Sequence, residues 1–139
     1  MWNMIRNSED ISELMECFGG FRNSCVCDVR YRSGAYVGTA ADHFINDDLT
    51  VSVILQRRSL GDVQTFELRF SGVKKLTLMP LGKGMECYLT SACITADGRG
   101  VEFSTWEDLD DINADAGVLR ISAHTLMWRD ISDVMSYTA

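Results

Sequence analysis

Apolar and polar side chains alternate at every second position along much of the chain from residue 49 to residue 128. In one such run, Leu119, Ile121 and Ala123 are separated by polar residues. Because successive side chains of a β-strand point to opposite faces of its sheet, this pattern predicts strands with one buried face and one solvated face. It is typical of an antiparallel sheet that is covered on one side only. Strands are predicted at residues 25–32, 36–37, 49–58, 63–71, 73–79, 86–96, 101–106 and 117–128.

Near the start of the chain the apolar period is different. Residues 8–18 place apolar side chains at every third or fourth position, which predicts one amphipathic helix. Ser8 is the expected N-cap, and Gly19-Gly20 is the expected end, since glycine accepts the left-handed conformation of a helix C-cap. A helix this short is marginal alone, so we expect it to pack on the apolar face of the sheet.

Short connections join the predicted strands. Leu60-Gly61-Asp62 and residues 97–100 carry the turn residues of β-hairpins. Residues 40–48 and the acidic residues 107–115 are expected to be irregular connections, and the tail from Asp130 to form a helical turn. Consecutive strands with short loops favour antiparallel neighbours. The predicted fold is mainly β (α+β): an antiparallel meander or sandwich of about seven to eight strands with one N-terminal helix.

Length and charge narrow the function classes. A chain of 139 residues fits a single domain over residues 1–139. Its net charge of -7 argues against generic binding to nucleic acid or to anionic membranes, which use basic patches, and favours a basic partner or a cation. No apolar run approaches the roughly 20 residues of a membrane span. Five cysteines without a signal-peptide pattern predict reduced thiols in a cytoplasmic protein.

The cysteine pattern favours structural roles. Cys25 and Cys27 are predicted on the strand face that also carries Val29. A zinc site needs four ligands, and Cys87 and Cys93 lack the spacing of a second ligand pair. We therefore interpret the cysteines as core thiols and predict no metal and no cofactor.

The sequence also favours a surface position without a functional role for His124 and for the acidic segment. His124 is predicted on the polar face of its strand. Asp111, Asn113 and Asp115 have the alternate spacing of the first ligands of an EF-hand loop, but Ala116 stands where that loop requires glycine. An acidic surface loop is the preferred interpretation, with weak cation binding as the alternative.

Two segments resemble a bacterial protein family. They are residues 14–24 (LMECFGGFRNS) and the block formed by residues 55–58 and 66–78. Both are similar to segments of small uncharacterised bacterial proteins that open with an FGGFHDS-like sequence and continue as a β-rich domain. Some relatives are assigned as immunity proteins of toxin systems, and the resemblance implies such a role. Arg22-Asn23 stands where that family has His-Asp, and because asparagine favours turns, the change favours a turn over chemistry.

The preferred functional hypothesis is a cytosolic binding protein without enzymatic activity, in particular an immunity-type inhibitor of a basic toxin domain. A protein partner is expected, and nucleic acid and membranes are not. Acidic charge would steer such a basic partner to the surface. The predicted contact residues are Asp108, Asp110, Asp111 and Asp115.

Two alternatives stay open. The first is a small ligand-binding or enzymatic β domain whose site lies in the loop of residues 42–48, since loops often carry function. The second is a homodimer formed through an exposed strand edge. No catalytic residue is predicted from a motif, and the ligand-binding candidates are Asp42, His43, Asp47 and Asp48.

Overall fold

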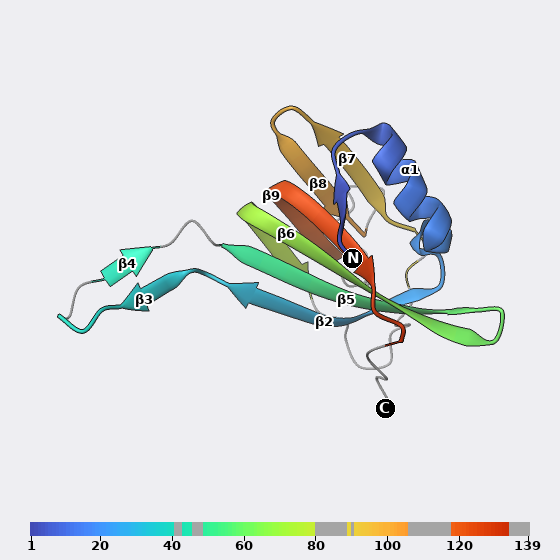
Figure 1. Ribbon diagram of the computed structural model, residues 1–139, viewed down its shortest axis with the longest axis horizontal. Helices are drawn as coiled ribbons and strands as arrows, with labels where there is room; N and C mark the ends of the chain where they lie inside the picture. The colour runs from blue at the N-terminus through green and yellow to red at the C-terminus, as the bar shows by residue number, and fades with distance from the viewer. Residues whose placement is uncertain (41–42, 46–48, 80–88, 90, 106–117, 134–139) are drawn as a thin grey trace.

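The computed structural model describes residues 1–40, 43–45, 49–79, 89, 91–105 and 118–133 (Figure 1). It is mainly β, with a single helix near the N-terminus, as predicted. The described elements are β1 (Asn3–Ile5), α1 (Ser8–Cys17), the 3-10 turn η1 (Gly19–Phe21), β2 (Ser24–Arg32), β3 (Ala35–Val37), β4 (His43–Ile45), β5 (Thr50–Ser59), β6 (Asp62–Met79), β7 (Cys93–Asp97), β8 (Gly100–Ser104) and β9 (Val118–Asp130).

Seven strands form one antiparallel sheet in the order β2-β5-β6-β9-β8-β7, with β1 also paired to β9. One edge of β9 pairs with β6 from Phe66 to Met79. Its other edge pairs first with β8 and then with β1. β9 therefore connects the β5–β6 hairpin on one side of the sheet with the β7–β8 hairpin on the other, and it also pairs with the N-terminal strand β1.

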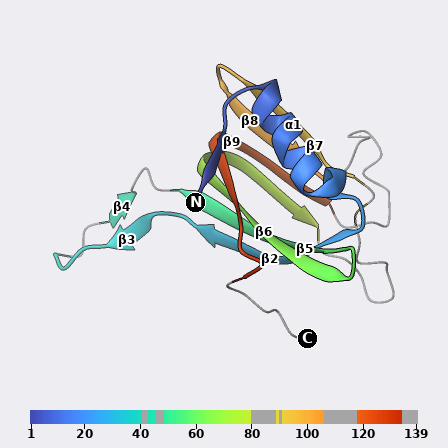
Figure 2. The same cartoon turned by 45° about the vertical axis from the view of Figure 1, so that its right-hand side comes forward.

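The core lies on the face of the sheet that α1 covers, which we call the inner face (Figures 1 and 2). Leu14 and Phe18 bring the apolar stripe of α1 into it and are fully buried. The ring of Phe18 stacks on Phe66 at 4.3 Å between centroids, and Phe66 stacks on Trp128 at 5.2 Å. Aromatic burial thus fixes the helix to the central strands. Within the described residues, no helix has the length and hydropathy needed to cross a membrane.

The N-cap of α1 is Asn7, so the prediction of Ser8 was wrong. Asn7 has an extended backbone with φ of -153°, and its side-chain oxygen accepts a 3.0 Å hydrogen bond from the Asp10 N–H. Ser8 is already the first helical residue. Asparagine and serine are both good N-caps, so the sequence alone did not distinguish Asn7 from Ser8, and the predicted start of the helix was one residue too late.

β6 is one strand of 18 residues, where the sequence predicted two strands separated at Gly72. Gly72 adopts φ of +64° and bends the strand without ending it. The N–H groups of Gly72 and Val73 both donate to the Leu49 carbonyl at the bend. Glycine tolerates this left-handed conformation, and β6 can therefore change direction while keeping both neighbours.

A bulge in β2 overturns the predicted placement of the cysteines. Val26 pairs with Leu55 and Asp28 with Ile54, which makes Cys27 the extra residue. The face that carries Val29 therefore does not carry Cys27, whose thiol donates instead to the Gln56 side chain at 3.5 Å. The core-thiol interpretation was also wrong in part, because Cys17, Cys27 and Cys93 are exposed.

The short strands β3 and β4 form a separate antiparallel hairpin that extends away from the main sheet in both views (Figures 1 and 2). The prediction of an irregular connection at residues 40–48 was wrong where β4 forms. The predicted hairpin turns are confirmed, since Ser59 pairs with Asp62 and Asp97 pairs with Gly100.

Two glycines provide a matched test of the bend in β6. Gly72 and Gly20 have nearly the same φ, +64° and +67°, but a Cβ at Gly72 would lie 2.6 Å from the His124 ring, whereas a Cβ at Gly20 would meet nothing within 4 Å. Gly20→Ala should cost about 1 kcal/mol of unfolding free energy through the left-handed backbone alone. Gly72→Ala should cost at least about 2 kcal/mol, because the contact with His124 adds to that strain. Urea denaturation measures both, and equal losses would contradict the role given to the cross-strand contact.

Candidate functional site

The face of the main sheet opposite the inner face, which we call the open face, carries two cross-strand rows of polar residues. Alternation directs Ile121 of β9 and Phe103 of β8 into the core, so their neighbours in sequence point to the open face. The strand register then aligns residues from β6, β9, β8 and β7 in that order. The first row consists of Lys75, Ser122, Glu102 and Thr95. The second row consists of Thr77, Arg120, Ser104 and Cys93.

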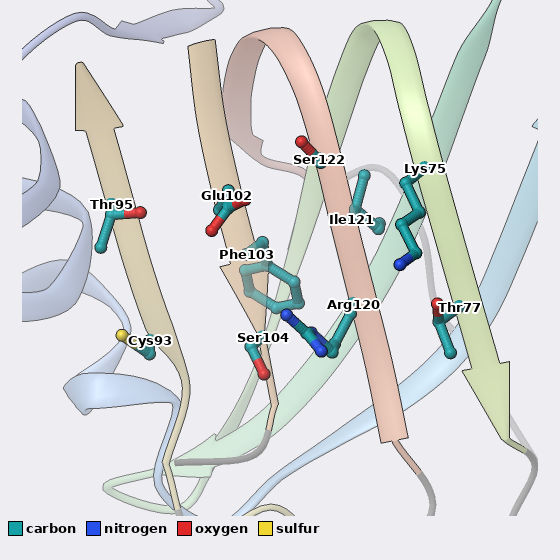
Figure 3. Close-up of a pocket in the computed structure, with 10 residues that line it drawn as sticks. All are labelled: Lys75, Thr77, Cys93, Thr95, Glu102, Phe103, Ser104, Arg120, Ile121 and Ser122. Atoms are coloured by element: carbon teal, nitrogen blue, oxygen red, sulfur yellow. The ribbon is translucent and has the colours of Figure 1, made fainter. Parts of the chain in front are cut away.

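These rows line a groove of about 300 Å³ (Figure 3). The hollow has a simple cause. Ser122 and Ser104 have short side chains and lie in the middle strands, between the longer side chains of Lys75, Arg120 and Glu102. The side chain of Arg120 extends from β9 toward β8, above Ser104. Within the part of the chain that the structure describes, the groove is therefore a product of side-chain length on a continuous sheet.

The positive charges of the groove have no acidic partner among the described residues. The described ion pairs all lie elsewhere, between Arg6 and Asp10, Arg30 and Asp28, and Glu67 and two arginines. Arg120 is only half-buried, and Lys75 is exposed. A guanidinium that is partly removed from water forms its strongest hydrogen bonds with anionic oxygens. The groove is thus suited to a carboxylate or phosphate group, with hydroxyl groups beside the two cations.

A second polar cluster on the open face consists of one carboxylate that pairs with two arginines. Glu67, only 7% exposed, accepts from Arg129 at 2.7 Å and lies 3.5 Å from Arg69. The Trp2 ring covers both arginines, with the guanidinium carbons 4.3 Å and 4.5 Å from its centroid. These cation–π contacts fasten β1 to the sheet. Because both guanidinium groups contact the Glu67 carboxylate and the Trp2 ring, we interpret the cluster as structural.

Most residues predicted from sequence to form a site lie outside the described part of the chain. His43 begins β4, where its backbone pairs with Val37, but its side chain is not among the described ones. His124 is exposed, as its polar-face assignment predicted. The structure therefore brings none of the predicted site residues together. The residues outside the description are Asp42, Asp47, Asp48, Asp108, Asp110, Asp111 and Asp115.

Metal and thiol chemistry receive no support from the described residues. Among them, no three His, Cys, Asp or Glu side chains gather closely enough to hold a metal ion. Partial burial raises the pKa of the Cys17 thiol, and the negative charges of Glu13, Glu16 and Asp130 raise it further. A raised pKa lowers the thiolate fraction at neutral pH, which makes Cys17 a poor nucleophile.

The comparisons with known proteins give no independent assignment: no protein-family model, curated protein or solved structure matches the chain. The resemblance of residues 14–24 to immunity-type proteins therefore stays a prediction.

Replacing a glutamate by glutamine should lower the stability of the protein more in the Glu67 cluster than in the groove. Glu67→Gln removes the carboxylate between two arginines and should destabilise the protein by about 2 kcal/mol, since it leaves buried hydrogen-bonding groups unmatched. Glu102→Gln makes the same chemical change at an exposed groove position that has no ion pair with any described residue, and the variant should stay within about 0.5 kcal/mol of the wild type. Thermal or urea unfolding of the two variants measures the contrast. A loss within about 0.5 kcal/mol in Glu67→Gln as well would show that the Glu67 cluster is not a stabilising element.

Proposed function

We propose that the protein is a binding protein that holds an anionic group of its ligand in the groove of the open face. The observation that carries this proposal is Arg120, a half-buried residue that lines a concave surface and has no acidic partner among the described residues. Lys75 adds a second positive charge, and Ser122 supplies a hydroxyl between the strands. Convergent polar groups in a concave surface are typical of a ligand site.

The overall charge of -7 does not oppose this proposal. At physiological salt the Debye length is about 8 Å, so a ligand in the groove responds mainly to charges within that range. Many of the acidic residues lie on other elements. Helix α1 alone carries Glu9, Asp10, Glu13 and Glu16, with no basic residue between them, and it covers the opposite face of the sheet.

Titration with inorganic phosphate or acetate tests the anion site. In the wild-type protein, backbone amide NMR signals of β8 and β9 around the groove should shift saturably. Arg120→Gln should weaken this binding by about tenfold or more, because charge-assisted hydrogen bonds to the anion are lost. Arg99→Gln is the matched control: it removes one positive charge from the exposed β7–β8 turn, outside the groove. Equal effects of the two substitutions would contradict the proposal.

The immunity-type inhibitor of a basic protein is the second candidate function, and the charge of α1 favours it. Glu9, Glu13 and Glu16 are exposed on that helix, and the single ion pair described there joins Arg6 to Asp10. A surface of one sign steers a partner of the opposite sign and increases its association rate. The cytoplasmic location and the acidic contact residues predicted from the sequence belong to this candidate.

Co-purification with the basic product of a neighbouring gene tests the second candidate. Glu9→Gln with Glu13→Gln should reduce complex formation, and the affinity of the wild type should fall as salt is raised. The double variant Asp62→Asn with Asp133→Asn removes two exposed charges from other elements and serves as the control. If both double variants bind as the wild type does, α1 is not the contact surface.

A further inference from the structure

Glu102 gives the groove a feature that a simple anion site would not need. It lies on β8, directly across from Ser122 of β9, and Lys75 of β6 pairs with the same serine from the other side. Glu102 is exposed and has no basic partner among the described residues, so its negative charge is available to a ligand.

The register separates Lys75 from Glu102 across the groove. Adjacent strands are about 4.8 Å apart, which places the backbones of Lys75 and Glu102 roughly 10 Å from each other. Arg120 is the diagonal neighbour of both residues on the intervening strand. Lys75 therefore places positive charge over β6, Arg120 extends its guanidinium from β9 toward β8 beside Ser104, and Glu102 places negative charge farther along β8, with Ser122 between Lys75 and Glu102 (Figure 3).

We infer that the ligand of this groove is a compact dipolar molecule, with an anionic group held by Lys75 and Arg120 and an ammonium group held by Glu102. This inference rests on the proposed function and specifies the ligand for it. The groove of about 300 Å³ suits a molecule of the size of an amino acid or a dipeptide.

The same arrangement explains which ligands the groove would reject. A purely anionic ligand such as phosphate can occupy the positive side, but it gains nothing from Glu102 and is repelled by its carboxylate. A ligand that also has an ammonium group can instead donate a charge-assisted hydrogen bond to the Glu102 carboxylate. Selectivity then comes from the Glu102 carboxylate, which attracts a dipolar ligand and repels a purely anionic one.

Diglycine and its N-acetyl derivative test the inference, because they share the carboxylate and differ in the ammonium group. With the full chain at pH 7, calorimetry should show diglycine binding about tenfold more tightly than N-acetyldiglycine. An α-amino group titrates near pH 8, so the preference should decline as the pH is raised through that value. Acetate and inorganic phosphate serve as anions without an ammonium group.

Three variants assign the effect to residues. Glu102→Gln should remove the preference for diglycine but keep the binding of N-acetyldiglycine, whereas Arg120→Gln should weaken both by about tenfold or more. Glu9→Gln makes the same charge change on α1 and should leave the preference intact. Circular dichroism spectra and unfolding curves show that each variant folds.

The outcomes separate this inference from the proposed function. Equal affinities for the two peptides in the wild type, or a preference that survives Glu102→Gln, would overturn the dipolar ligand while leaving the anion site in place. No binding of either peptide, acetate or phosphate would overturn the anion site as well.

Discussion

The antiparallel pairing of β6 with β9 is the interaction on which the rest of the structure depends. It runs from Phe66 and Asp130 at one end to Met79 and Val118 at the other. β5 and β2 extend the sheet from β6, and β8, β7 and β1 extend it from β9. The inner face of this pair supplies Phe66, on which Phe18 at the end of α1 stacks, and Trp128, which stacks on Phe66. Its open face supplies one side of the groove. Loss of the pairing would therefore remove the core and the candidate site together.

The two faces of this sheet divide the charge of the protein. On the covered side, α1 buries its apolar stripe and presents glutamates to solvent, since a short helix is stabilised by packing one face only. On the open side, Lys75 and Arg120 create a positive region within an acidic molecule. A net charge is a sum over the surface, and it therefore does not determine what an individual groove binds. The two candidate functions use opposite faces and do not exclude one another.

Alternation in the sequence predicted β2 and the longer strands of the main sheet, and apolar spacing of three to four residues predicted the helix, because those properties depend on neighbours along the chain. The three-residue strands β1 and β4 are too short to show such a pattern and were missed. The bulge at Cys27 and the bend at Gly72 were missed, since each depends on a partner strand. The groove could not be predicted for a related reason. Lys75, Glu102 and Arg120 are distant in sequence and meet only because β9 lies between β6 and β8. Strand order is a property of the tertiary structure, and the pattern of apolar and polar residues in a single sequence does not reveal it.

Arg120 and Glu67 show how burial and pairing separate structural charges from functional ones. Glu67 is buried, and its two arginine partners and the Trp2 ring satisfy the cluster internally. Arg120 and Glu102 occupy the same open face, are diagonal neighbours across β9 and β8, and yet form no ion pair with each other. Stability alone would favour their pairing or a neutral replacement. Because these opposite charges are not paired with each other, both are available to a ligand, which is the arrangement that a dipolar molecule requires.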